Sequence, residues 1–254
     1  MFNINKNTSL YQLEELVKKD LQDRVEYLPE SFYEEQKKVL EIFKKRIELE
    51  KIIEETITFN KKINWENNTK NLYLVKTAEE LIDVFKLRSD IYAKYGYSKE
   101  FPDTIDGLSF DNYDTHSAII YYKSDNSKAT GSIRLIIGTE ENKLPTEDKI
   151  DLQYLKNIYS SMGEISKLVV DSKRKGLNLE FKYLLRGVYE VFFHNNIEFI
   201  LSAIKTSDFK LYKKLGNFEL IKEIPSYGKI KEPFSVISYD PISVSDFSKK
   251  SILS

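Results

Sequence analysis

The side chains that could do chemistry in this 254-residue chain are carboxylates, basic groups and phenols. Cysteine is absent, which excludes disulfides, thiolate metal sites and a cysteine nucleophile. The two histidines, His116 and His194, have no second ligand at the spacing of a metal site, so no metal centre is expected. We therefore expect chemistry that depends on acidic and basic residues.

Three short segments place charged side chains within or beside apolar runs. Asp111 and Asp114 lie in DNYD, Arg134 lies in GSIRLIIG, and Glu164 opens EISKLVVD. A charge on a buried strand must be paired or functional, because burying it alone is costly. The sequence leaves open whether Glu164 forms a structural ion pair with Arg134 or takes part in a reaction.

Overall charge excludes some partners. The chain has 39 Lys and Arg against 40 Asp and Glu, so no overall field favours nucleic acid or an anionic membrane. The first residues lack the pattern of a secretory signal, and no apolar run reaches the ~18 residues of a membrane span. We expect a cytoplasmic protein without an integral membrane segment.

Residues 1–65 are predicted to form a helical hairpin. Apolar residues at three- and four-residue steps predict a helix over 9–28, capped by Ser9 and ended before Pro29. Ser31 and Glu34 form a capping box for a second helix that runs to about Phe59. The polar, Asn-rich stretch 60–70 is typical of a linker, so residues 66–254 are expected to be a second domain.

Across 66–254, short apolar strands alternate with helices, which predicts an α/β fold with a mixed, mostly antiparallel sheet flanked by helices. Helices are expected from the capping box of Thr77 and Glu80 to Gly96, after Gly176, and over 209–215. Strands are expected over residues 71–76, 116–123, 131–138, 164–171, 198–204, 218–221 and 234–240.

This order of elements resembles the GNAT superfamily of acyltransferases. The charged motifs resemble a subgroup of it, the acyl-homoserine-lactone synthases and the related N-acyl amino acid synthases. The matching residues, in that family's order, are Arg88 four residues before Tyr92, Gly96 with Tyr97, the two aspartates of DNYD, Arg134, Glu164 and the C-terminal segment LYKKLGNFEL. Together they extend over about 72–222.

Two residues depart from the pattern of the lactone synthases. Lys167 replaces an arginine, which keeps the charge but loses the planar fork, and Tyr97 replaces a tryptophan. The N-terminal hairpin also has no counterpart in the small lactone synthases. These departures favour the N-acyl amino acid synthases.

The resemblance implies an N-acyltransferase that moves a fatty acyl group from acyl carrier protein, or from acyl-CoA, to an amino acid or similar small amine. No permanently bound cofactor is expected. The amine attacks only when neutral, so the site must remove a proton and stabilise an oxyanion. Glu164 is the candidate base and Ser166 a second catalytic residue, because strand alternation would put both on one face with Leu168 and the intervening residues on the other.

The remaining motif residues are assigned to substrate binding or to ordering of the segment 96–115 over the site. An ordering role is favoured for the two arginines and two aspartates, which could form a charge network. The assigned residues are Arg88, Tyr92, Asp111, Asp114, Arg134 and Lys167.

Tyr212 lies where many GNAT enzymes place a tyrosine that protonates the departing thiolate. A phenol with a pKa of ~10 suits that step, although a tyrosine on a short helix is more often a packing residue.

The turn KRKG resembles the phosphate-binding turn of GNAT enzymes, where backbone N–H groups at a helix N-terminus meet the donor. Asn178 stands where a second small residue is expected, which fits a single phosphate better than a pyrophosphate. Basic residues there and on the later short helix could contact an acidic carrier protein, or they could be a solvated turn. They are Lys173, Arg174, Lys175 and Gly176, with Lys210, Lys213 and Lys214.

Two alternatives remain open from the sequence. The chain could be a lactone synthase that uses S-adenosylmethionine, or a GNAT-like module that binds a partner without catalysis. The enzyme hypotheses require Glu164, Arg134 and the two aspartates to meet at a cleft between parted central strands.

Overall fold

The computed structural model describes residues 30–67, 69–101, 104–123, 128–139, 141–171, 179–215, 218–226 and 231–239. The chain forms two compact units, Met1–Lys51 and Ile52–Ser254. The division falls within helix α2, Glu30–Lys62. This helix includes residues 60–62 of the expected linker. The first helix predicted over 9–28 lies outside the described residues, so a separate hairpin domain stays a prediction.

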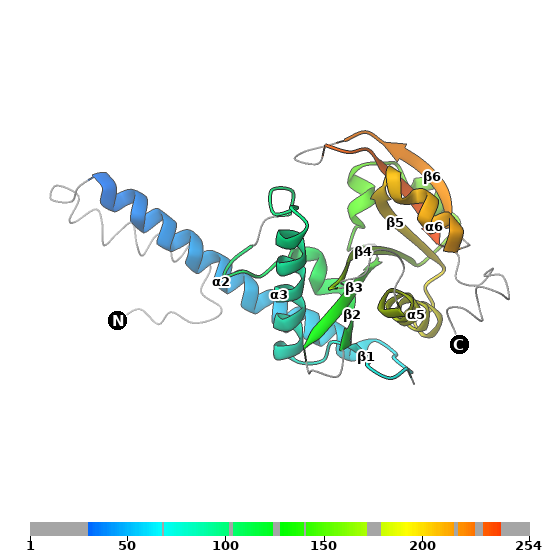
Figure 1. The fold of residues 1–254 in the computed structure, drawn as a ribbon, viewed down its shortest axis with the longest axis horizontal. Helices are drawn as coiled ribbons and strands as arrows, with labels where there is room; N and C mark the ends of the chain where they lie inside the picture. The colour runs from blue at the N-terminus through cyan, green and yellow to red at the C-terminus, as the bar shows by residue number, and fades with distance from the viewer. Residues whose placement is uncertain are drawn as a thin grey trace. The chain divides into compact units, whose positions relative to one another are not determined.

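A seven-stranded sheet forms the centre of the second unit, in the order β1-β2-β3-β4-β5-β7-β6 (Figure 1). The pairing between β4 and β5 is parallel and the other five are antiparallel, which confirms the predicted mixed, mostly antiparallel sheet. The strands are β1 Leu72–Leu74, β2 Ser117–Lys123, β3 Ala129–Gly138, β4 Met162–Val170, β5 Phe199–Lys205, β6 Phe218–Ile224 and β7 Phe234–Tyr239.

Helices cover both faces of the sheet (Figure 1). Helix α5, Leu179–His194, packs on β1, β2 and β3, whereas α3, Ala78–Lys94, packs on β3 and β4. The two helices contact opposite faces of the sheet. Successive side chains of β3 point alternately into the core under α5 and toward α3. The short helix α6, Phe209–Leu215, packs against β6, at the position predicted for it.

Helix α3 is fixed at both ends by the signals that the sequence carries. The Thr77 hydroxyl accepts from Glu80 N at 3.3 Å, and the Glu80 carboxylate accepts from Thr77 N at 3.1 Å, which confirms the capping box. Gly96, at φ +77°, follows the helix end. The fixed register turns Arg88 of α3 into the protein interior, where it is fully buried.

The segment between β3 and β4 carries structure that the sequence did not predict. It contains the 3-10 turn η3, Pro145–Asp148, and the one-turn helix α4, Gln153–Lys156. Buried Leu144, Ile150, Leu152 and Leu155 pack with Ile136 of β3 and Met162 of β4. This packing holds the segment over the start of β4, where it contacts Glu164.

Candidate active site

Strands β4 and β5 are paired only at their beginnings. Met162–Ile165 pair with Phe199–Ser202, and the last pair is secured by the Ser202 hydroxyl, which donates to the Ile165 carbonyl at 2.9 Å. Beyond it β4 continues to Val170 against β3, and β5 continues to Lys205 against β7. The hydrogen-bonded pairing of β4 with β5 therefore ends directly after Glu164 and Ile165, and the two strands separate there.

A β-bulge in β4 lies next to this separation. The β3–β4 register shifts between Ser132 and Arg134, and Lys167 takes φ +46°, in the left-handed region that non-glycine residues seldom adopt. The strand alternation predicted past Ser166 was wrong for this reason. Lys167 points to the side of Glu164 and Ser166, whereas Leu168 packs into the core under α5.

Two aspartates and three cations meet beside the bulge. Arg134 Nη1 lies 2.5 Å from Asp111 Oδ1 and 3.0 Å from Asp114 Oδ1, and its Nε donates to Ser166 Oγ at 2.9 Å. Arg88 Nη1 lies 2.8 Å from Asp114 Oδ1, and Lys167 Nζ lies 2.9 Å from Asp111 Oδ2. The structure thus brings six of the predicted site residues into one hydrogen-bonded cluster.

The same aspartates organise the chain that carries them. Asp111 caps the 3-10 turn η2, Asn112–His116, by accepting from Tyr113 N at 3.0 Å, and Asp114 Oδ2 accepts from Asp111 N at 2.9 Å. Each carboxylate therefore bonds to a backbone N–H and to at least one cation. This arrangement supports the ordering role proposed for the network.

Electrostatics keep the cluster ionised. Burial opposes ionisation of Asp111 and Asp114, but their cationic partners outweigh it and hold the pKa of both carboxyls below the ordinary value. Burial also opposes the charge on Arg134, yet the two aspartates raise its pKa. For Lys167 burial dominates and lowers the pKa, with Asp111 acting in the opposite direction.

Glu164 lies on the same face of β4 but binds a different element. Its Oε2 accepts from the backbone N–H of Thr146, on η3, at 2.9 Å, and the residue is 3% exposed. Burial raises its pKa to about 7, against the lowering effects of Thr146 and the Arg134 charge. Within the described part of the chain no direct Glu164–Arg134 ion pair is formed, so the structural alternative raised by the sequence is not what the structure shows.

Comparison with known proteins identifies the family of the chain. A family model described as "N-acyl amino acid synthase FeeM" matches residues 83–240, which is more than half of the chain. The chain belongs to the FeeM family of N-acyl amino acid synthases. It is therefore an acyltransferase. No curated protein sequence matches it.

Solved structures of this class share the fold of this FeeM-family synthase. The FeeM synthase from uncultured soil microbes superposes with a TM-score of 0.56 at 13% identity, over 70% of this chain and 95% of that one. The CoA-dependent acyl-homoserine lactone synthase BjaI gives 0.52 at 16% identity, over 68% and 82%. The acyl-homoserine lactone synthase LasI gives 0.50 at 14% identity, over 70% and 93%.

Two side chains that the sequence did not single out, those of Tyr113 and Lys205, also reach the candidate site of this FeeM-family synthase. Tyr113 lies between the two parts of the site: burial and the charges of Asp148, Asp111 and Glu164 raise its pKa. Lys205, at the end of β5, donates to the Tyr97 hydroxyl at 2.7 Å, which joins the loop after α3 to the far side of the strand separation. The aromatic residue inside DNYD was a signal that could have drawn attention to Tyr113.

Tyr92 and Tyr212 lie in aromatic packing. The Tyr92 ring contacts Phe101, with centroids 5.0 Å apart, and burial raises its pKa. The Tyr212 ring meets Phe218 edge-on at 5.3 Å in the core under α5, and burial raises its pKa to about 12. A role for Tyr212 in protonating the leaving thiolate stays a prediction, as does the phosphate turn Lys173–Gly176, which lies outside the described residues.

The described residues contain no group of three or more His, Asp and Glu side chains that could hold a metal ion. Among the helices described, none is both long and apolar enough to cross a membrane.

Proposed function

We propose that this FeeM-family synthase transfers a fatty acyl group from the thioester of an acyl carrier protein to the amine of a free amino acid or similar small amine. The observation that carries the proposal is Glu164, a buried carboxyl whose pKa is raised to about 7, next to the point where β4 separates from β5. A base is most effective when its pKa lies near the working pH.

The reaction needs one proton acceptor on the protein. The neutral amine nitrogen attacks the thioester carbon, a C–N bond forms, and the nitrogen's proton passes to Glu164. The C–S bond then breaks, and the departing thiolate takes up a proton to become a thiol. The parted strands would hold the acyl chain so that the carbonyl lies beside Glu164, with backbone N–H groups near the bulge stabilising the oxyanion.

Charge beside Glu164 supports an amino acid as the acceptor. Arg88 and Arg134 balance the two carboxylates of Asp111 and Asp114, so protonation of Lys167, which Asp111 favours and burial opposes, leaves one positive charge in excess. Lys167 is the accessible cation of this set, since its side chain is 15% exposed whereas Arg88 and Arg134 are at most 3% exposed. An acceptor carboxylate would be attracted to it.

The carrier-protein donor is supported by charge on α6. Lys210 and Lys213 are exposed on this helix, and carrier proteins are acidic. Coenzyme A is the second donor candidate, because the BjaI relative is CoA-dependent. The same acyl chain offered on both carriers would separate them.

The test measures thiol release and N-acyl product by mass spectrometry, with acylated carrier protein, acyl-CoA and a panel of amino acids and amines. We expect Glu164→Gln to lower turnover by a factor of roughly 10² to 10⁴. Glu180→Gln is the matched control, because Glu180 is a half-buried carboxyl on α5 whose pKa burial also raises. Unchanged turnover in Glu164→Gln would remove Glu164 from the mechanism. Release of methylthioadenosine from S-adenosylmethionine would instead assign lactone synthesis.

A further inference from the structure

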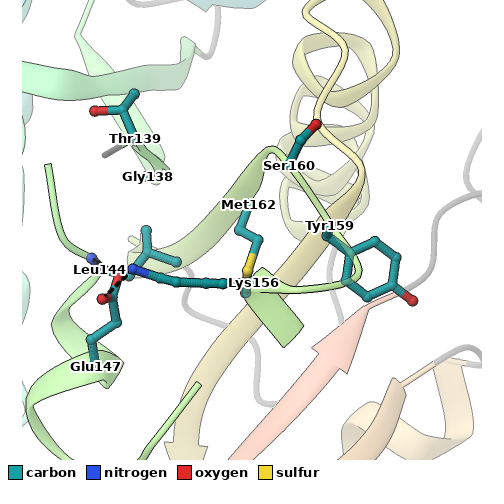
Figure 2. A pocket seen from close by; sticks show the side chains of 8 residues that line it. All are labelled: Gly138, Thr139, Leu144, Glu147, Lys156, Tyr159, Ser160 and Met162. Carbon is teal, nitrogen blue, oxygen red and sulfur yellow. Dashed lines mark hydrogen bonds and ion pairs between the residues drawn. The ribbon is translucent and has the colours of Figure 1, made fainter. Parts of the chain in front are cut away.

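A pocket of about 370 Å³ opens at the start of β4, away from the charge cluster (Figure 2). It lies on the Glu164 side of the sheet, because Met162 in its wall is two residues before Glu164 on the same strand. Its size falls at the lower end of ligand sites, ~300 to 1,000 Å³, which favours a small molecule. The lining residues are Gly138, Thr139, Leu144, Glu147, Lys156, Tyr159, Ser160 and Met162.

One ion pair dominates the chemistry of this pocket. Lys156 Nζ lies 2.6 Å from Glu147 Oε2, and Figure 2 shows the lysine side chain stretched toward the carboxylate. The pair is partly exposed, at 36% for the lysine and 13% for the glutamate, so it contributes little to stability and can exchange partners. Leu144 and Met162 supply a buried apolar wall, and the Tyr159 ring is stacked on Phe199 with centroids 4.6 Å apart.

We propose that this pocket is a second site, separate from the acceptor site at Lys167, that binds a free α-amino acid in its zwitterionic form, with the carboxylate on Lys156, the ammonium on Glu147 and the side chain against Leu144 and Met162. The pair is neutral overall, so a ligand with one charge would satisfy one partner and leave the other facing a like charge. A zwitterionic amino acid carries its ammonium and its carboxylate on one carbon atom, so it can bind Glu147 and Lys156 at the same time. Hydroxyls of Thr139 and Ser160 in the lining can add hydrogen bonds.

The pocket and Glu164 share one structural element. Glu147 follows Thr146 on η3, and its Oε1 accepts from Leu144 N at 2.9 Å, which helps to hold the turn in place. Thr146 N in turn donates to Glu164. The negative charge of Glu147 also contributes to the raised pKa of Glu164, so the pocket lies within electrostatic reach of the base of the proposed function.

Calorimetric titration with leucine and two analogues, each lacking one of its charged groups, tests the binding itself. The probes are L-leucine, its amine 3-methylbutylamine and its acid 4-methylpentanoate. We expect leucine to bind and each single-charge analogue to bind at least tenfold more weakly, because one charge-assisted hydrogen bond is lost. Equal binding of the amine or the acid would overturn the proposal.

Variants locate the binding in this pocket. Lys156→Met and Glu147→Gln should each weaken leucine binding at least tenfold, whereas Lys156→Arg, which keeps the charge, should retain it. Glu147→Gln keeps the oxygen that accepts from Leu144 N, so the turn is preserved. Glu164→Gln should lower turnover as given above and leave leucine binding in place. This variant therefore separates failure of this inference from failure of the proposed function. Leucine binding unaffected by Lys156→Met would contradict it.

Discussion

At the residue scale, the central feature is a single carboxyl whose environment suits proton transfer at neutral pH. Glu164 is 3% exposed, binds one backbone N–H and lies outside the direct reach of the cations that keep Asp111 and Asp114 ionised. Carboxyls that belong to one candidate site thus have opposite pKa shifts. In enzymes, environments that shift the pKa values of nearby carboxyls in opposite directions are typical of sites where such a group acts as an acid or a base.

The pH dependence of the reaction follows from this shift. Because Glu164 must be ionised to accept a proton and its pKa is about 7, kcat/KM for acyl transfer should rise with pH through an inflection near 7. Rates measured from pH 5.5 to 8.5 test this. The inflection should be absent from the residual activity of Glu164→Gln, and an unchanged inflection in that variant would assign it to another group.

Stability should show the opposite trend. A carboxyl whose folded pKa is about 7, against an ordinary 4.5, binds its proton more tightly when folded, so its contribution to stability falls as pH rises from about 4.5 to about 7. Glutamine has no such proton. Glu164→Gln should therefore gain stability relative to wild type between pH 5 and pH 8, by up to roughly 3 kcal/mol in urea unfolding. A difference independent of pH would show that the Glu164 pKa is not raised.

At the element scale, strand β4 does three things within nine residues. Its first residues pair with β5, its bulge turns Lys167 to the side of Ser166, and its last residues pair with β3 alone. The bulge therefore decides which side chains face the charge cluster. The left-handed backbone of Lys167 is retained although glycine would adopt it without strain, which fits a position where the ammonium is needed.

Two substitutions separate the backbone of Lys167 from its charge. Both Lys167→Gly and Lys167→Ala remove the ammonium, but only glycine tolerates φ +46° freely, so the glycine variant should be the more stable by about 1 kcal/mol. If the ammonium attracts the acceptor carboxylate, both variants should raise KM for the amino acid to a similar extent, with a smaller effect for a simple amine. Thermal unfolding and acceptor titrations measure the two effects. Equal stability of the variants would mean that the bulge is not strained in solution.

At the scale of the whole molecule, the sequence predicted the features that depend on residues close together along the chain. The capping box of Thr77 and Glu80, the turn at Gly96 and the strands β2 and β3 all follow from local patterns. Two-residue alternation failed in β4, because a bulge depends on the partner strand. The contact between Thr146 and Glu164, and the one between Tyr97 and Lys205, join distant parts of the chain and leave no local signal.

The separation of β4 from β5 beside Glu164 is the feature on which the proposed reaction depends. The most direct measurement is a crystal structure with a pantetheine thioether that carries an acyl chain and a ketone in place of the thioester. We expect the acyl chain to lie between β4 and β5. The ketone carbon should lie about 3 to 6 Å from the Glu164 carboxylate, close enough for one amine or water molecule to bridge them. A chain bound elsewhere, or a ketone on the far side of β4 from Glu164, would contradict the proposed site.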